Sequence, residues 1–344
     1  MISNSYTPAS QLLARNTAHF EDKDLLIAGY IEDTFPTELA KIAKKVTLFS
    51  YDYSAKLHYD NVSSIDNHCS TEYKAAKKHQ AALIYISKSK AEVEYLLANI
   101  AEQLEDGAMI FMVGENNAGI RSANKFFAPY GDICNKLDGA RRSSLFVTEL
   151  NKPVAKFVQD DWITTFPISV NGIELTVSTL PGVFSHGKLD TGSNILLNNL
   201  HKKPSGRVLD LGCGAGIIGS YIAKRFPESK VEMTDVSALA VKSSQLTLAA
   251  NELAGQAYLS DVYSDISGTF DYIISNPPFH AGLKTHYAST ETFLKEANGY
   301  INPRGHLVLV ANSFLKYPEI IEASFGHCLL QTKSSKFCVY YANK

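Results

Sequence analysis

The sequence of 344 residues lacks the features that mark membrane, disulfide-rich or collagen-like proteins. It has only five cysteines, 12 prolines and 21 glycines, and no two cysteines stand in CxxC spacing. An odd number of scattered cysteines argues against a disulfide framework and a zinc ribbon, and fits reduced thiols. No apolar run approaches the roughly 20 residues that cross a bilayer, and the first residues lack the basic and apolar regions of a signal peptide. We therefore expect a cytoplasmic protein without a membrane span.

Charge of one sign is not in excess either. Lys and Arg total 33 and Asp and Glu total 35, which gives a net charge of −2. Overall charge therefore does not demand nucleic acid, and any contact with it has to come from a local cluster of basic residues. We expect one strip of basic side chains drawn from Arg121, Lys125, Arg141, Arg142, Lys284, Arg304 and Lys316.

The second half of the chain alternates between short apolar runs and stretches with helical spacing. Ser237 is a suitable N-cap for the helix that follows it. The expected strands are 207–211, 230–235, 258–261, 270–275 and 305–311, and the expected helices are 217–225, 238–251 and 292–300. Such alternation predicts an α/β fold with a mainly parallel, doubly wound sheet.

The first half repeats this pattern weakly. The order of its segments matches that of the second half, which indicates two tandem copies of one Rossmann-like architecture. After Gly29 no second glycine follows, so we expect the first copy to be degenerate. The matching segments are an apolar run at 24–29, a helix at 37–45, and apolar runs at 81–86 and 108–114.

Length also favours two domains, since domains usually hold about 100–200 residues. Two prolines, a glycine and the only tryptophan mark 151–173 as the region between them. We expect a first domain at 1–160, which serves substrate docking or folding support, and a catalytic domain at 161–344.

The strongest local feature of the second half is a strand that runs into a glycine-rich turn, Val208–Gly216. Glycines let the backbone approach a ligand closely, and the start of the next helix offers free N–H groups to an anionic group. Gly214–Gly219 also fits the dinucleotide pattern G-x-G-x-x-G, and Asp235 stands at the end of the next strand, where a ribose-binding acid belongs. The loop alone indicates a nucleotide cofactor and leaves NAD open.

A second motif, Asn276-Pro277-Pro278-Phe279, directly follows an apolar strand. The prolines end the strand and stiffen a loop at the carboxyl edge of the sheet, where α/β sheets bind ligands. The Asn276 side chain and the Pro277 carbonyl can accept both protons of one planar amino group, while Phe279 stacks on the ring that bears it. This arrangement suits methylation of an exocyclic amine, whose delocalised lone pair is weakly nucleophilic. We assign Asn276, Pro277 and Phe279 as catalytic residues.

Taken in this order, the motifs resemble those of class I S-adenosylmethionine-dependent amino methyltransferases. The resemblance implies S-adenosyl-L-methionine as the cofactor. It places two loop glycines against the methionine part, Asp235 on the ribose hydroxyls, and Asp261 with Val262 at the adenine edge. Asp190 or Ser193 would lie near the cofactor's amino group. The cofactor-binding residues so implied are Asp190, Ser193, Asp210, Gly212, Gly214, Asp235, Asp261, Val262 and Asn276.

Other segments extend the resemblance over essentially the whole chain. Residues 180–197 precede the glycine loop as they do in bacterial 16S rRNA guanine-N2 methyltransferases. In the first half, 6–10, 113–122 and 140–142 are similar to the small-subunit methyltransferase C type of that family. The resemblance implies methyl transfer to N2 of a guanine in 16S rRNA within assembling 30S particles, and an inactive first domain. We expect a monomer.

Several alternatives stay open at this point. The same acceptor motif serves adenine-N6 and protein-glutamine methylation, and a noncatalytic RNA-binding assembly factor would keep only the fold. No metal site is expected, because His280 and His286 have no third ligand at metal spacing. Cys213, inside the glycine loop, is interpreted as a small filler without thiol chemistry.

Overall fold

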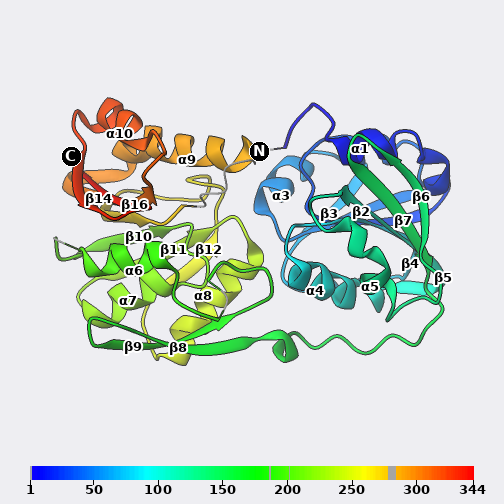
Figure 1. Cartoon of the computed structure of the whole chain (residues 1–344), viewed down its shortest axis with the longest axis horizontal. Helices are drawn as coiled ribbons and strands as arrows, with labels where there is room; N and C mark the ends of the chain where they lie inside the picture. The colour runs from blue at the N-terminus through cyan, green and yellow to red at the C-terminus, as the bar shows by residue number, and fades with distance from the viewer. Residues whose placement is uncertain (1, 186, 201, 278–283) are drawn as a thin grey trace. The chain divides into compact units, whose positions relative to one another are not determined.

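The structure, a computed structural model, describes residues 2–185, 187–200, 202–277 and 284–344, with the backbone alone at 284–288. The chain divides into two compact units, Met1–Trp162 and Ile163–Lys344. Each unit contains a seven-stranded sheet with helices on both faces (Figure 1). Among the helices described, none is long and apolar enough to cross a membrane.

The sheet of the first unit has the strand order β3-β2-β1-β4-β5-β7-β6. Its first five strands are parallel, and β7 runs antiparallel to both β5 and β6. The strands are β1 (Asp24–Gly29), β2 (Lys45–Ser50), β3 (Ile65–Cys69), β4 (His79–Tyr85), β5 (Leu104–Glu115), β6 (Asn135–Ala140) and β7 (Ser143–Glu149). The helices are α1 (Pro8–Leu13), α2 (Phe35–Leu39), α3 (Tyr53–Tyr59), α4 (Lys90–Ala101) and α5 (Ala123–Phe127), with 3-10 turns η1 (Thr17–Phe20), η2 (Ile120–Ser122) and η3 (Gln159–Trp162).

The second unit repeats this order as β12-β11-β10-β13-β14-β16-β15 and adds a two-stranded hairpin, β8-β9. The strands are β8 (Thr164–Val170), β9 (Ile173–Thr179), β10 (Arg207–Leu211), β11 (Lys230–Asp235), β12 (Gln256–Leu259), β13 (Phe270–Ser275), β14 (Ile301–Asn312), β15 (Leu329–Lys333) and β16 (Phe337–Asn343). The helices are α6 (Thr191–Asn198), α7 (Ile217–Arg225), α8 (Ala238–Ala250), α9 (Lys284–Glu296) and α10 (Tyr317–Phe325), with the 3-10 turn η4 (Ala297–Tyr300). The predicted fold class of two tandem, mainly parallel sheets is confirmed.

The central strand β10 shows why the second sheet forms. Alternate residues of a strand point to opposite faces. Leu209 and Leu211 therefore share a core with Phe293 of α9 and Ile321 of α10, while Asp210 faces α7. Four of the five residues of β10 are buried, as expected for a parallel strand covered by helices on both faces. In Figure 1, α9 and α10 cover one face of this sheet, and α6, α7 and α8 cover the other.

Most of the expected elements of the second half match the structure. The ranges 207–211, 217–225, 230–235 and 270–275 agree residue for residue with β10, α7, β11 and β13. The Ser237 hydroxyl caps α8 and accepts the Ala240 N–H at 3.4 Å, as predicted. The strand predicted at 258–261 is β12, which begins two residues earlier, and the helix predicted at 292–300 covers the end of α9 and the turn η4.

One prediction in the first half is wrong. The helix expected at 37–45 ends at Leu39, and Lys45 already belongs to β2. The N–H groups of Lys44 and Lys45 donate to the carbonyl of Lys23, just before β1. This tie brings the apolar residues after Lys45 alongside β1, where sheet pairing and burial outweigh the weak helical periodicity.

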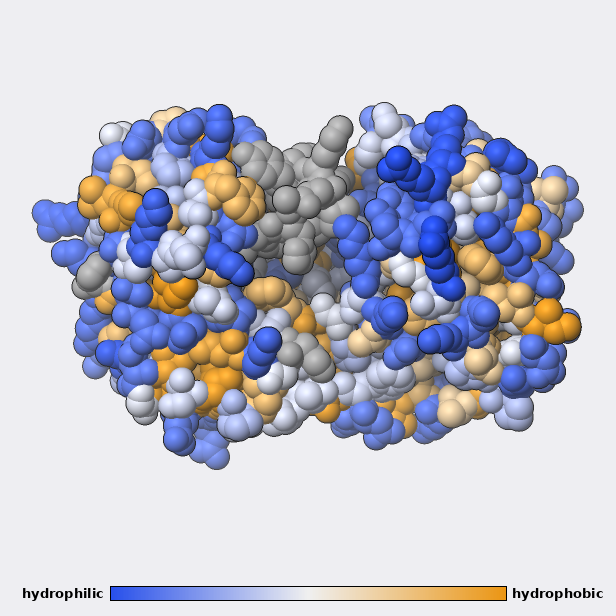
Figure 2. Space-filling view, in the orientation of Figure 1, coloured by the Kyte–Doolittle hydropathy of each residue, from blue (hydrophilic) through white to orange (hydrophobic). Residues whose placement is uncertain are grey.

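The surface gives no sign of a broad apolar binding face on the side of the first unit seen in Figure 2. Hydrophilic residues predominate there, and hydrophobic ones are scattered among them. Scattered apolar side chains are normal on protein surfaces.

Candidate active site

Three of the predicted site residues meet at the carboxyl edge of the second sheet. Strand β10 pairs in parallel with β11 on one side and with β13 on the other. Gly212, Asp235 and Asn276, each the last residue of its strand or the one after it, therefore lie next to one another in the sheet order. This edge is where open α/β sheets bind ligands.

The glycine loop after β10 needs glycine at three positions for its backbone conformation. Gly212, Gly214 and Gly216 have φ angles of 74°, 55° and 73°, in the left-handed region that other residues avoid. A Cβ on Gly216 would lie 2.9 Å from the Ser244 backbone in α8, so this glycine lets loop and helix pack closely. A Cβ on Gly212 would meet no atom within 4 Å, so the loop is open at that point.

Asp235 links this loop to the start of α8. One carboxylate oxygen accepts the Gly214 N–H at 3.0 Å, and the other accepts the Ser237 N–H at 2.9 Å. A carboxylate oxygen has more than one lone pair, so both oxygens can accept further donors such as hydroxyl groups. Asp235 is only partly buried, which keeps its carboxylate within reach of a ligand at this edge.

Asp210 lies beneath the loop, fully buried. Its Oδ2 accepts the Gly219 N–H at 2.8 Å, in the first turn of α7, and its Oδ1 has no hydrogen-bond partner among the described residues. Burial raises the pKa of this carboxyl to about 7; the Gly219 hydrogen bond opposes that shift, and the nearby charge of Asp235 adds to it. These contacts give Asp210 a part in holding the helix start, and its direct contact with a cofactor stays a prediction.

Asn276 has its side-chain amide fixed in one orientation. Both Nδ2 hydrogens are used, because Nδ2 donates to Asp190 Oδ1 at 3.0 Å and to Ser193 Oγ at 2.9 Å. The amide oxygen Oδ1 is buried and has no hydrogen-bond partner in the described part of the chain. The site therefore presents a fixed, unused hydrogen-bond acceptor.

The two partners of Asn276 come from the first turn of α6. Asp190 is the N-cap, and its Oδ1 also accepts the Ser193 N–H at 2.9 Å. Its other oxygen accepts the Ser185 hydroxyl at 3.1 Å. A Cβ on Gly192 would lie 3.2 Å from Asn276 Oδ1, so glycine at this position lets the helix approach the amide. The sequence analysis predicts Asp190 or Ser193 near the cofactor's amino group, but it gives no sign that both bind Asn276.

The remaining predicted site residues lie around this group. Pro277 is buried directly after Asn276, whereas Phe279 falls outside the described residues. Asp261 and Val262 follow β12, which pairs with β11, and so lie at the same edge. The Asp261 N–H donates to the Ser264 hydroxyl at 2.9 Å, and Val262 has a φ of 55°. Their assignment to the adenine edge stays a prediction.

Cys213 is unsuited to thiol chemistry. Its side chain is buried, and burial, followed by the charges of Asp235 and Asp210, raises the pKa of the thiol well above its usual value. A thiol held protonated in this way is a poor nucleophile. Within the described ranges, no three His, Cys, Asp or Glu residues form a group that could hold a metal ion. His280 and the side chain of His286 fall outside those ranges.

The predicted basic strip is wrong for Arg304. Strands β13 and β14 are parallel, with Phe270 opposite Ile301 and Ser275 opposite Leu309. Arg304 therefore lies toward the amino end of β14, at the edge of the sheet opposite Asn276. Lys316 follows the carboxyl end of β14, and the side chain of Lys284 is not described. The four candidates for the basic strip in the first unit are all exposed: Arg121, Lys125, Arg141 and Arg142.

Comparison with known proteins identifies the family. The Methyltransferase small domain model matches residues 174–341, and the Methyltransferase small domain N-terminal model matches residues 10–166. The chain is 45% identical over 341 residues to Ribosomal RNA small subunit methyltransferase C of Vibrio vulnificus (strain CMCP6), which covers 99% of this chain and 100% of that protein. The protein of the same name from Aeromonas hydrophila is 46% identical over 343 residues, covering 98% and 99%. The chain belongs to the ribosomal RNA small subunit methyltransferase C family.

A solved structure resembles this member of the ribosomal RNA small subunit methyltransferase C family over almost its full length. It is the T. thermophilus 16S rRNA N2 G1207 methyltransferase (RsmC) in complex with AdoMet and guanosine, with a TM-score of 0.85 and 25% identity. The match covers 99% of this chain and 93% of that one. The family predicted from the motifs is therefore confirmed for both halves of the chain. The glycine loop alone left NAD open as the cofactor, and membership of this family sets the alternative of an NAD-dependent dehydrogenase aside.

Proposed function

We propose that this chain transfers a methyl group from S-adenosyl-L-methionine to the exocyclic N2 of a guanine in 16S rRNA. The observation that carries the proposal is the Asn276 amide, whose buried oxygen is an unpartnered acceptor held in place by Asp190 and Ser193. Two likenesses support it: full-length relatives named ribosomal RNA small subunit methyltransferase C, and the T. thermophilus enzyme whose complex holds AdoMet and guanosine.

The residues around the glycine loop fit S-adenosylmethionine, which when bound supplies an electrophilic methyl group. The open space at Gly212 gives a ligand close access to the backbone. Asp235 has oxygens able to accept ribose hydroxyls while it holds the Gly214 N–H. Asp261 and Val262 follow the neighbouring strand, and we assign them to the adenine.

Asn276 and Pro277 act on the substrate amine. Asn276 Oδ1 accepts one N–H of the guanine amino group, and we assign the second N–H to the Pro277 carbonyl. Two acceptors draw the nitrogen away from the planar form in which its lone pair is delocalised, so the lone pair becomes available for attack. No strong base is needed, because the nitrogen becomes cationic when it takes the methyl group and its surplus proton then passes to water. A buried acceptor left without a donor is costly, so the pocket favours a base that carries an amino group at this point.

The form of the substrate follows from the same geometry. A guanine amine engaged in base pairing is not accessible to Asn276, so the base has to be unpaired or flipped out. We propose the guanine equivalent to the one named for the T. thermophilus enzyme, G1207, presented within the 30S subunit. We further propose that the enzyme acts as a monomer in the cytoplasm, with its second unit catalytic and its first unit serving substrate docking.

The test is methylation with labelled S-adenosylmethionine, offered 30S subunits that lack the modification, protein-free 16S rRNA, DNA and protein. We expect the label in N2-methylguanosine at one position of 16S rRNA. Asn276→Ala should lower kcat by about 10²–10³, the loss typical of one preorganised hydrogen-bonding group, with cofactor affinity within about twofold. Asn198→Ala, an exposed asparagine of α6, is the matched control. Label in adenine N6 or glutamine, no label at all, or near-normal turnover by Asn276→Ala would overturn the proposal.

A further inference from the structure

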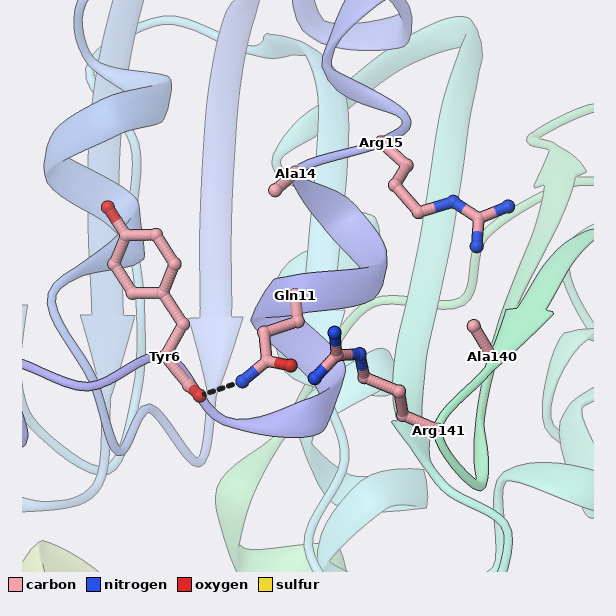
Figure 3. A pocket seen from close by; sticks show the side chains of 6 residues that line it. All are labelled: Tyr6, Gln11, Ala14, Arg15, Ala140 and Arg141. Carbon is pink, nitrogen blue, oxygen red and sulfur yellow. Dashed lines mark hydrogen bonds between the residues drawn. The ribbon is translucent and has the colours of Figure 1, made fainter.

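The first unit contains an open pocket of about 530 Å³ that the proposed chemistry does not use (Figure 3). It lies where α1 meets the turn between β6 and β7. Two guanidinium groups reach it, that of Arg15, which follows the end of α1, and that of Arg141 in the turn. Its lining residues are Tyr6, Gln11, Ala14, Arg15, Ala140 and Arg141.

The turn that carries Arg141 has an unusual composition. Arg141 and Arg142 form the two-residue connection between β6 and β7, with φ angles of 50° and 63°. Positive φ at both positions is the type I′ hairpin turn, which strongly favours asparagine and glycine. Both arginines are exposed, and within the described chain neither takes part in an ion pair. Arginines held in a strained turn without a partner point to a task for their side chains.

Gln11 supplies an unused acceptor in the same pocket. Its Nε2 donates to the Tyr6 carbonyl at 2.7 Å, which fixes the amide, and its Oε1 is buried without a hydrogen-bond partner among the described residues. Figure 3 shows the side chain of Arg141 extending toward this amide. The pocket therefore offers a positive donor group and a neutral acceptor together.

Arg15 is held at the rim by the acidic group there. Asp138 lies 3.3 Å from the Arg15 guanidinium and also accepts the Asn16 side-chain N–H at 2.9 Å. The Arg15 side chain remains 61% exposed, so most of its five N–H donors stay available. Asp138 orients the Arg15 guanidinium and offsets part of its positive charge. Arg141 therefore attracts an anion more strongly than Arg15 does.

The second copy of the fold lacks these groups. The spacing from the N-cap of the first helix to the first strand is the same in both copies, from Thr7 to Asp24 and from Asp190 to Arg207. By this spacing Asn194 and Asn198 stand where the first copy has Gln11 and Arg15. The turn between β15 and β16 is Ser334-Ser335-Lys336. The arginine pair is thus a feature of the first unit and not of the fold.

We propose that this pocket binds the sugar–phosphate backbone of the 16S rRNA substrate, an inference that rests on the proposed function. Arg141, with Arg15, holds a phosphate, since guanidinium donors match phosphate oxygens in pairs. Gln11 Oε1 needs a hydrogen donor, which a phosphate lacks and an adjacent ribose 2′-hydroxyl provides. Because DNA has no such hydroxyl, Gln11 gives the pocket a preference for RNA.

The phosphate contacts are tested by RNA affinity over a range of salt concentrations, measured with labelled 16S rRNA transcript. The test variant combines Arg15→Gln with Arg141→Gly, because glycine accepts the positive φ of the turn. Its matched control, Lys74→Gln with Lys77→Gln, also removes two exposed positive charges from the first unit, but outside the pocket. Two lost phosphate contacts should make the slope of log affinity against log salt shallower by about 1.4, at roughly 0.7 for each contact with single-stranded RNA. A slope and affinity equal to those of the control would overturn the proposal.

The hydroxyl contact is tested with Gln11→Leu, which roughly keeps the size of the side chain and removes Oε1 together with the Nε2 donor to the Tyr6 carbonyl. Binding is compared for a single-stranded RNA and a DNA of the same sequence. We expect the preference for RNA to fall roughly fivefold, the value of one hydrogen bond, and an unchanged preference would remove Gln11 from the proposal. Cofactor affinity and the unfolding midpoint are measured on each variant to confirm folding. If the wild type fails to methylate guanine N2, the proposed function fails, whereas the pocket is then judged by the salt slopes alone.

Discussion

At the scale of single residues, the site depends on where the two hydrogens of one amide go. Asn276 gives both to the first turn of α6, one to the carboxylate of Asp190 and one to the Ser193 hydroxyl. An amide in which nitrogen and oxygen exchanged places would put a carbonyl against that carboxylate, so the observed orientation is strongly favoured. We therefore expect Asp190 to be a positioning residue, which would act on the substrate through Asn276.

We expect Asp190→Asn to lower kcat about tenfold. Asparagine remains a good N-cap, so α6 should persist with little loss of stability. Without the carboxylate charge, the hydrogen bond that orients the Asn276 amide weakens, because bonds to ionised groups are roughly twice as strong as neutral ones. Steady-state kinetics and thermal unfolding of the variant measure both effects.

A double-mutant cycle decides whether Asp190 acts through Asn276. In the Asn276→Ala background, Asp190→Asn should have almost no further effect on kcat, since the group it orients is gone. Independent, additive losses in kcat would mean that Asp190 serves the reaction in some other way.

At the scale of elements, one buried carboxyl joins strand β10 to helix α7. Asp210 extends from the strand to the Gly219 N–H in the first turn of the helix. The folded protein keeps this carboxyl protonated up to about pH 7, whereas in the unfolded chain it ionises near pH 4. Between these values the folded state holds a proton that the unfolded state has released. The contribution of Asp210 to stability therefore falls as the pH rises from about 4 to about 7.

Asp210→Asn should remove this pH dependence. The asparagine oxygen can still accept the Gly219 N–H, and it carries no charge to bury. Relative to the wild type, the free energy of unfolding of the variant should therefore rise between pH 5 and pH 7, by up to about 1.4 kcal/mol per pH unit, and stay level above that. Urea unfolding at several pH values measures it, and a difference between the two proteins that is constant with pH would contradict the shifted pKa.

The elements differ in how well the sequence alone predicts them. Strands such as β10 and β13 were predicted residue for residue, because each is a short apolar run ended by glycine or proline. The prediction of a helix at 37–45 is wrong, because pairing with β1 decides where β2 begins. The antiparallel hairpin strands β6 and β15 were not predicted, since their exposed, mixed composition carries no periodic signal.

The candidate site, like the elements, has some features that the sequence predicts and others that it does not. The glycine loop, Asp235 and Asn276 are legible in the sequence, because each is a local motif at a strand end. The contact of Asp190 and Ser193 with Asn276 depends on the packing of α6 against a loop far away in the chain, which no local pattern records. The sequence predicts only part of the pocket of the first unit. Arg141 is among the predicted basic candidates, whereas Gln11 and Arg15 are not.

At the scale of the whole molecule, the two copies put different side chains at the same places of one fold. When the first residues of β1 and β10 are matched, Asp33 stands where the second copy has Gly216. The Asp33 carboxylate accepts the Ser10 hydroxyl at 2.9 Å and the Thr7 N–H at 2.6 Å. Tyr85 pairs with Gly29 in the sheet and so matches Asn276, and its hydroxyl hydrogen-bonds Ser10 at 3.0 Å. The first copy fills this edge with its own buried polar side chains.

The substitution at the end of the second strand completes the contrast. Ser50 ends β2 as Asp235 ends β11, and its hydroxyl donates to the Gly29 carbonyl at 3.0 Å. The first copy therefore has no carboxylate at the place where the second has the proposed ribose-binding acid. The first copy keeps a glycine with positive φ, Gly29, but it lacks the carboxylate that would bind the ribose of a nucleoside.

We therefore expect the full chain to bind one molecule of S-adenosylmethionine, and titration calorimetry measures the stoichiometry directly. Asp235→Asn should weaken binding by at least tenfold, because hydrogen bonds from ribose hydroxyls to an ionised carboxylate contribute about 1.5–3 kcal/mol. Ser50→Ala, the matching change in the first copy, should leave affinity and stoichiometry unchanged. Two binding sites per chain, or a loss of affinity in Ser50→Ala equal to that in Asp235→Asn, would mean that the first unit still holds the cofactor despite its filled edge.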